Sequence, residues 1–278
     1  MLKLIHLSKD PIQMITSSQN SKIQWVRSLQ VKSHQRREDQ AFIAEGVRLV
    51  EEALQAGWQA RLVLYEPSLS ERGLQIVEAY ARLGAPVEQV APQVMRAASD
   101  TGTPQGLLAV IGLQELKLPA DLDFVFIPDA VRDPGNMGAM LRSASAAGVQ
   151  AVYLTPGCVD AFSPKVLRAA MGAHFHVPLL IRDWAEIQVE AQRHSWTVYL
   201  AAASEGLAYT QADFRQPLAL ITGGEAEGAG LSARSLAHQQ VHIPMPGRAE
   251  SLNAAIASAV LMFEVVRQRS AAPSPTGG

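Results

Sequence analysis

The segment Ile243-Pro244-Met245-Pro246-Gly247-Arg248-Ala249-Glu250-Ser251-Leu252-Asn253 is the most informative part of the chain. Its first residues are typical of a buried strand end, and proline and glycine then indicate a turn. An apolar run follows Ser251, and serine is a preferred helix N-cap, so the pattern predicts a helix from about Leu252 to Arg269. Open α/β sheets bind ligands at the carboxyl ends of their strands. We therefore expect this loop to form part of a site.

Two earlier segments repeat this arrangement of a strand end, a glycine-containing loop and a helix. They are Asp133–Gly138, with Arg142 behind it, and Leu220–Gly228. Each loop taken alone also fits an ordinary turn. Together the three loops predict one site built from distant parts of the chain, with two amides, a guanidinium, a carboxylate and a hydroxyl supplied by Asn136, Asn253, Arg142, Glu225 and Ser251.

Strands and helices alternate along the whole chain, which predicts an α/β protein of two domains. Residues 17–112 form a small domain, and the short segment Leu116–Asp121, which contains a proline, is the expected linker. Residues 122–270 carry longer alternating elements, which predict a parallel sheet covered by helices on both faces.

Composition narrows the functional classes. The formal net charge of −2 gives no global attraction to nucleic acid, so any RNA binding needs a local basic patch. Cys158 is the one cysteine, which rules out an intrachain disulfide. No signal peptide or membrane-spanning run is visible, and we expect a soluble cytoplasmic protein. The chain lacks a Walker A sequence and a G-x-G-x-x-G after the strand that opens either half, so the common nucleotide-binding motifs are absent from the sequence. His174 and His176 lack a third ligand at suitable spacing, so no metal is expected.

The three loops also match a known family in their order and spacing. Asn136-x-Gly138 with Arg142, then Gly223-x-Glu225-x-x-Gly228, then Ile-Pro-Met with Ser-Leu-Asn resemble the three motifs of SpoU (TrmH) RNA 2′-O-ribose methyltransferases, of the SPOUT superfamily. The resemblance covers about residues 122–268. More weakly, Arg36-Arg37 before Phe42–Gly46, and Thr103–Gly106, resemble the family's L30e-like substrate-binding domain.

The resemblance implies a C-terminal trefoil-knot domain that binds S-adenosylmethionine and a homodimer that completes the site. The residues at the family's cofactor positions are Thr222, Gly223, Ile243, Met245, Ser251 and Leu252. The residues at its active-site positions are Arg142, Asn136, Glu225, Ser251 and Asn253. One departure is Ala226, where relatives often carry glycine.

The role of Arg142 stays open between two readings. The family resemblance implies that this arginine acts as the base on the 2′-hydroxyl. A free guanidinium titrates above about 12 and resists deprotonation, so holding the adjacent phosphate and stabilising the developing alkoxide is the alternative.

A basic stretch in the N-terminal domain is the expected RNA-binding patch, with Lys32, Arg36 and Arg37 as its contacts. The same stretch also fits a solvated helix face. The function implied by the resemblance is methylation of a ribose 2′-hydroxyl, with 23S ribosomal RNA as the favoured substrate. The alternatives are a tRNA 2′-O-ribose methyltransferase, or a non-catalytic RNA-binding or ribosome-assembly factor on the same fold.

Overall fold

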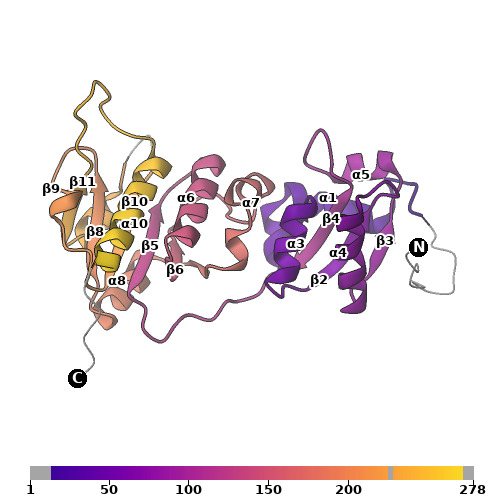
Figure 1. The fold of residues 1–278 in the computed structure, drawn as a ribbon, viewed down its shortest axis with the longest axis horizontal. Helices are drawn as coiled ribbons and strands as arrows, with labels where there is room; N and C mark the ends of the chain where they lie inside the picture. Colours follow the sequence, from indigo (N-terminus) through magenta and orange to yellow (C-terminus); the bar gives the residue numbers. More distant parts are fainter. Residues whose placement is uncertain (1–13, 225–227, 272–278) are drawn as a thin grey trace. The chain divides into compact units, whose positions relative to one another are not determined.

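The computed structural model describes residues 14–224 and 228–271. The chain divides into two compact units (Figure 1). The N-terminal unit contains the chain up to Gln114 together with Phe162–Pro164, and the C-terminal unit contains Glu115–Ala161 and the chain from Lys165 onward. Each unit has its own sheet.

The N-terminal unit is built on a four-stranded sheet in the order β1-β4-β2-β3. Strand β4 is antiparallel to both β1 and β2, and β3 is parallel to β2. The strands are β1 (Ala41–Glu45), β2 (Ala60–Tyr65), β3 (Val87–Gln89) and β4 (Leu107–Gly112). The helices are α1 (Ser21–Val31), α2 (Ser33–Glu38), α3 (Val47–Gln55), α4 (Glu71–Arg82) and α5 (Pro92–Ala98).

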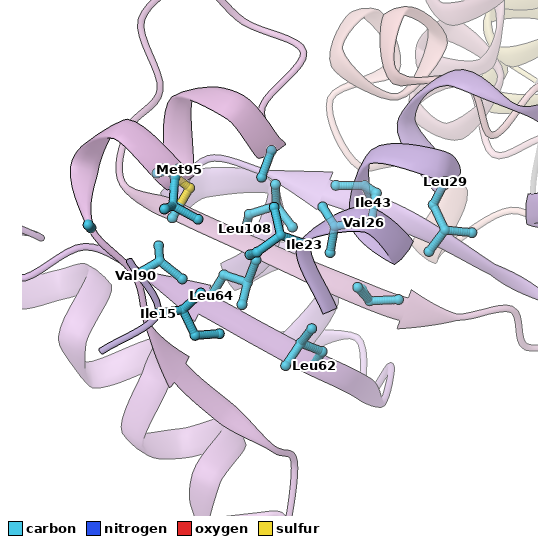
Figure 2. Close-up of a cluster of buried hydrophobic side chains, with 14 of the residues drawn as sticks. Ile15, Ile23, Val26, Leu29, Ile43, Leu62, Leu64, Val90, Met95 and Leu108 are labelled. Carbon is cyan, nitrogen blue, oxygen red and sulfur yellow. The ribbon is translucent and has the colours of Figure 1, made fainter. Parts of the chain in front are cut away.

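A hydrophobic core fixes this sheet against helices α1 and α5. Ile23 and Val26 of α1 and Met95 of α5 are fully buried against strand residues such as Leu64 and Leu108 (Figure 2). The apolar residues of α1 recur at helical spacing, which gives the helix one face to bury. The core therefore makes the N-terminal unit a packed domain in its own right.

The C-terminal unit is built on a seven-stranded sheet in the order β7-β6-β5-β10-β8-β11-β9. Every pairing in it is parallel, which confirms the parallel sheet predicted from the alternation of elements. The strands are β5 (Phe124–Asp129), β6 (Ala151–Leu154), β7 (Leu179–Ile181), β8 (Thr197–Ala202), β9 (Leu207–Ala208), β10 (Leu218–Gly223) and β11 (Gln239–His242).

Helices cover both faces of this sheet. Successive side chains of a strand point to opposite faces. On β10, Ala219 and Ile221 point to one face of the sheet, where they belong to a core that includes residues of α8 and α9. Thr222 therefore points to the opposite face. Helices α6 and α10 cover that face and lie side by side (Figure 1). The helices are α6 (Pro134–Ala146), α7 (Pro164–Ala170), α8 (Trp184–Arg193), α9 (Leu231–Leu236) and α10 (Ala254–Ala271), with short 3-10 turns η1 (Ala173–Phe175) and η2 (Tyr209–Gln211).

The last helix begins later than the sequence predicts. Helix α10 starts at Ala254, and the side chain of Asn253, the residue before it, caps the helix in place of Ser251. The Asn253 Oδ1 atom accepts hydrogen bonds from the backbone N–H groups of Ala255 (3.0 Å) and Ile256 (3.2 Å). The prediction that Ser251 is the N-cap was therefore wrong. Asparagine is as good an N-cap residue as serine. Ser251 instead lies exposed in the loop before the helix.

Across the part of the chain that the structure describes, no helix combines the length and the apolar character needed to cross a membrane.

Candidate cofactor and active site

A cavity of about 390 Å³ lies at the carboxyl ends of β8, β10 and β11, against the first turns of α10. This is the place where parallel sheets usually bind ligands, and the volume falls in the range of small-molecule sites, roughly 300–1,000 Å³. Its lining is made of small, apolar and glycine residues with a few polar groups: Ala201, Ala202, Ala203, Thr222, Gly223, Gly224, Gly228, Ala229, Val241, Ile243, Met245, Ser251, Leu252, Asn253, Ala254, Ala257 and Leu261.

The cavity brings together most of the residues singled out from the sequence. All six residues at the expected cofactor positions line it, namely Thr222, Gly223, Ile243, Met245, Ser251 and Leu252. Asn253, expected at the active site, lines it as well. These residues come from two loops separated by about twenty residues of chain, so the fold, and not the sequence, makes them neighbours.

Gly223 is required by the close crossing of another part of the chain. A Cβ atom built on Gly223 would lie 2.3 Å from both the backbone nitrogen of Ala229 and the carbonyl carbon of Gly228. Real Cβ contacts essentially never fall below 3.0 Å. The chain at Gly228–Ala229 therefore passes directly over the end of β10, and only glycine leaves room for it.

Asp129, at the end of β5, holds this crossing in place. Its side chain is 5% exposed, and its Oδ2 atom accepts a hydrogen bond of 2.7 Å from the backbone N–H of Gly230. Its Oδ1 atom accepts from the hydroxyl of Thr155 (3.2 Å), and its carbonyl accepts from the N–H of Gly224 (3.1 Å). Sequence reasoning missed Asp129, although a carboxylate that ends an apolar strand was a signal for it.

Asn136 and Asn253, the two asparagines expected at the active site, join the starts of two helices. The side-chain Nδ2 of Asn253 donates a hydrogen bond of 2.9 Å to the Oδ1 of Asn136. Asp133 is the N-cap of α6, and its Oδ1 accepts from the backbone N–H of Asn136 at 2.7 Å. The first turn of α6 is thus fixed by its cap, and its asparagine is fixed to the cap of α10.

Arg142 lies apart from this pair. It is exposed on α6, and it is not among the residues that line the cavity. Six residues at about 100° each place Arg142 roughly 240° around the helix from Asn136, so the two side chains leave different faces. Within the described ranges, the side chain of Arg142 forms no hydrogen bond or ion pair. Glu225, the other expected active-site residue, lies outside the described residues.

The three basic residues expected to contact RNA differ in their surroundings. Lys32 and Arg37 are exposed, whereas Arg36 is only 5% exposed. The Nη1 of Arg36 donates hydrogen bonds to the carbonyl oxygens of Leu29 and Gln30 near the end of α1. These carbonyls have no partner within the helix, so Arg36 closes the helix end and does not present its charge to a ligand.

Small residues shape the cavity, and sequence reasoning did not assign them to it. Ala201, Ala202 and Ala203 follow one another at the end of β8, and Ala254 and Ala257 face the cavity from α10. Their short side chains leave the space that larger residues would fill. The run of alanines at a strand end was the available signal.

Over the residues that the structure describes, no group of three or more His, Cys, Asp or Glu side chains is placed to hold a metal ion. The ring of His174 is fully buried, with its Nε2 2.6 Å from the carbonyl oxygen of Ala161. Burial lowers the pKa of His174 to about 4, so the ring is neutral at pH 7.

Comparisons with known proteins match both units. The model of the SpoU rRNA methylase family matches residues 123–263, and that of the MRM3-like substrate binding domain matches residues 20–109. The chain is 34% identical over 259 residues to the 23S rRNA (guanosine(2553)-2′-O)-methyltransferase RlmP of Bacillus subtilis, with 91% of this chain and 99% of the relative covered.

Solved structures show the same similarity. The AdoMet-bound rRNA methyltransferase of Sinorhizobium meliloti superposes with a TM-score of 0.81 at 29% identity, covering 92% of this chain and 97% of the other. The SpoU methyltransferase AviRb of Streptomyces viridochromogenes, in complex with the cofactor AdoMet, superposes with a TM-score of 0.80 at 28% identity, covering 91% of this chain and 100% of the other.

Proposed function

The chain belongs to the SpoU rRNA methylase family, and from this membership we propose that it transfers the methyl group of S-adenosylmethionine (AdoMet) to a ribose 2′-hydroxyl of 23S ribosomal RNA. The observation that carries the proposal is the single cavity that gathers Thr222–Gly224 and Ser251–Asn253 at the carboxyl edge of the sheet. The relative from Bacillus subtilis, similar over nearly its full length, is named for this reaction on 23S rRNA.

The cavity fits AdoMet in volume and in the chemistry of its lining. Val241, Ile243 and Met245 offer apolar surface for an adenine ring, and Gly223 and Gly224 offer backbone close to a ligand. When bound, AdoMet supplies a methyl group activated by its sulfonium. We propose that Thr222, Gly223, Ile243, Met245, Ser251 and Leu252 hold it.

The remaining residues are proposed to position the RNA. Asn136 and Asn253 form one hydrogen-bonded unit at the edge of the cavity, and Ser251 lies exposed beside it. Arg142 has no partner among the described residues, so its guanidinium is free to hold a phosphate and to stabilise charge on the attacking oxygen. We favour this role over that of a base because a guanidinium resists deprotonation. Glu225 keeps its proposed active-site role through the family motif alone.

We propose that residues 122–270 form a trefoil-knotted domain and residues 17–112 an L30e-like RNA-binding domain. The strand order supports the knot, because β10 enters the sheet between β5 and β8, and β11 enters between β8 and β9. Each of these strands therefore lies between two strands that precede it in the chain. Lys32 and Arg37 are the proposed RNA contacts of the N-terminal domain, and Arg36 is left out of the set because it is buried.

We also propose a homodimer that pairs through α10. Ile256 and Phe263 are 54% and 48% exposed on this helix, and seven residues apart they share one face. Exposed apolar groups on one helix face are typical of an interface. Phe263→Glu is expected to give monomers in light scattering, whereas Val189→Glu, at a 61% exposed apolar residue of α8, is expected to leave the dimer intact. A monomeric wild-type protein with full activity would contradict the proposal.

A methylation assay on isolated RNAs tests the reaction. The purified protein and radiolabelled AdoMet are incubated with unmodified 23S rRNA or with total tRNA, and ribose methylation is mapped by resistance of the backbone to alkaline cleavage. We expect one protected site in 23S rRNA. Protection in tRNA alone would favour the tRNA enzyme, and no protection with intact RNA binding would favour a non-catalytic assembly factor. We expect the reaction to take place in the cytoplasm, where 23S rRNA is made.

A further inference from the structure

The hydroxyl of Thr222 is an unusual polar group at the end of β10. The residue is 4% exposed and lines the cavity. Its Oγ1 atom is buried, and it has no hydrogen-bond partner among the residues that the structure describes. A buried hydroxyl without a partner is destabilising, and native proteins contain few of them.

The position of Thr222 gives no packing reason for a hydroxyl. Leu218 and Leu220 precede it on the same face of β10 and are fully buried apolar residues. Valine has almost the same shape as threonine and the same preference for a strand, and it would fill this place without a buried polar atom. The hydroxyl therefore points to a partner other than the residues that the structure describes.

Thr155, at the end of β6, shows what a satisfied buried threonine looks like in the same unit. It is 2% exposed, and its Oγ1 accepts from the backbone N–H of Ala130 at 3.1 Å. The hydroxyl lies 3.2 Å from both the carbonyl oxygen of Pro128 and the carboxylate of Asp129, to which it donates. Thr222, whose hydroxyl lacks such partners, lines the cavity, whereas Thr155 does not.

We propose that the Thr222 hydroxyl forms a hydrogen bond with bound AdoMet and is a side-chain determinant of cofactor affinity. The inference rests on the proposed function, because it takes AdoMet as the occupant of the cavity. A hydroxyl donates one hydrogen bond and accepts others, so it matches either a donor or an acceptor of the cofactor. Rotation about χ1 between staggered positions turns the hydroxyl toward a ligand without moving the backbone of β10.

Two substitutions separate the hydroxyl from the shape of the side chain. Thr222→Val removes the hydroxyl and keeps the shape, and Thr222→Ser keeps the hydroxyl. Calorimetric titration with AdoMet is expected to show roughly 2- to 12-fold weaker binding for Thr222→Val, the loss of one net hydrogen bond, and affinity close to wild type for Thr222→Ser. The Tm of the ligand-free Thr222→Val protein is expected to be unchanged or higher.

The matched control is Thr155→Val, which removes a hydroxyl that has partners in the protein. Its Tm without ligand is expected to fall, because the N–H of Ala130 loses its acceptor. Wild-type affinity for AdoMet in Thr222→Val, or a fall in its Tm as large as that of Thr155→Val, would overturn the inference. If the wild-type protein binds no AdoMet, the proposed function itself fails. If the wild-type and Thr222→Val proteins bind it equally, only the role of the hydroxyl fails.

Discussion

Replacing Gly223 by alanine tests whether the chain crossing at the end of β10 builds the cofactor cavity. The new Cβ would lie 2.3 Å from backbone atoms of Gly228 and Ala229, about 1.1 Å short of an ordinary contact at 3.4 Å. Backbone atoms cannot rotate away as a flexible side chain can. Gly223 is itself paired with Asp129 of β5, so the crossing chain must give way.

The loss of stability and of activity in Gly223→Ala follows from this displacement of the crossing chain. Overpacking a well-packed site typically costs about 1–3 kcal/mol, and two backbone clashes favour the upper end. Moving Gly228 and Ala229 also shifts one wall of the cavity and strains the hydrogen bond from Gly230 to Asp129. A misplacement of about 1 Å at a reacting site can reduce a rate by roughly 100-fold. We expect Gly223→Ala to lower the free energy of unfolding by about 3 kcal/mol and methyl transfer by about 100-fold.

Gly247 provides the matched control, because a Cβ built there meets nothing within 4 Å and its φ is not positive. Gly247→Ala is expected to be neutral, or to stabilise the protein by about 0.4–1 kcal/mol. Denaturant unfolding, AdoMet titration and single-turnover methylation are measured on both variants. A Gly223→Ala protein with wild-type stability and AdoMet affinity would refute the idea that this crossing shapes the cavity.

Three further predictions concern Asn253, Arg142 and the basic residues of the N-terminal unit. Asn253→Ala removes the cap of α10 and is expected to lower the free energy of unfolding by about 1 kcal/mol in denaturant unfolding. Asn253→Ser keeps a capping oxygen and is expected to keep most of the stability but to lower the turnover rate. Equal stability of the two variants would contradict the capping role. Arg142→Ala is expected to abolish single-turnover methylation at saturating RNA while AdoMet affinity stays near wild type, and near-normal turnover would remove Arg142 from the reaction. The double variant Lys32→Ala with Arg37→Ala is expected to weaken RNA binding and to reduce the slope of log affinity against log salt concentration by about one for each charge removed. Arg36→Ala is expected to lower the Tm instead. RNA binding that is sensitive to Arg36→Ala alone would reverse this assignment.

Local signals in the sequence predict best the strands that are short buried apolar runs, such as β4, β5, β6 and β10. The run Ala151–Leu154 and the run Ala60–Tyr65 coincide with β6 and β2. Such runs are bounded by glycine, proline and polar residues, and their pattern depends little on distant parts of the chain. Strand β9 has two residues and was not predicted, because pairing with β11 and not its own sequence makes it a strand.

The start of α10 shows where local signals are insufficient. Ser251 and Asn253 are both good N-caps, and the sequence alone does not choose between them. The choice comes from a tertiary contact, because Asn253 can cap the helix and at the same time bond to Asn136, which is 117 residues away. A serine at the cap has no second polar atom for that contact.

The basic stretch of the N-terminal unit shows a related limit. Arg36 and Arg37 are adjacent, and their sequence offers no reason to separate them. On α2 they point about 100° apart, so one guanidinium turns inward to the end of α1 and the other stays in solvent. Burial, which decides between a structural and a binding arginine, depends on how α1 and α2 pack and is absent from the local pattern.

The hydrogen bonds of Asn253 also determine what Asn136 presents to a substrate. The Oδ1 of Asn253 accepts from two backbone N–H groups of α10, which only an oxygen can do, so its Nδ2 must be the atom that faces Asn136. A donor there requires the acceptor Oδ1 of Asn136, at 2.9 Å, and this leaves the Nδ2 of Asn136 directed elsewhere. The cap of one helix therefore sets the amide orientation on another. Where Asn136 contacts the RNA through this Nδ2, it does so as a hydrogen-bond donor, and the group it recognises is an oxygen or an unprotonated ring nitrogen.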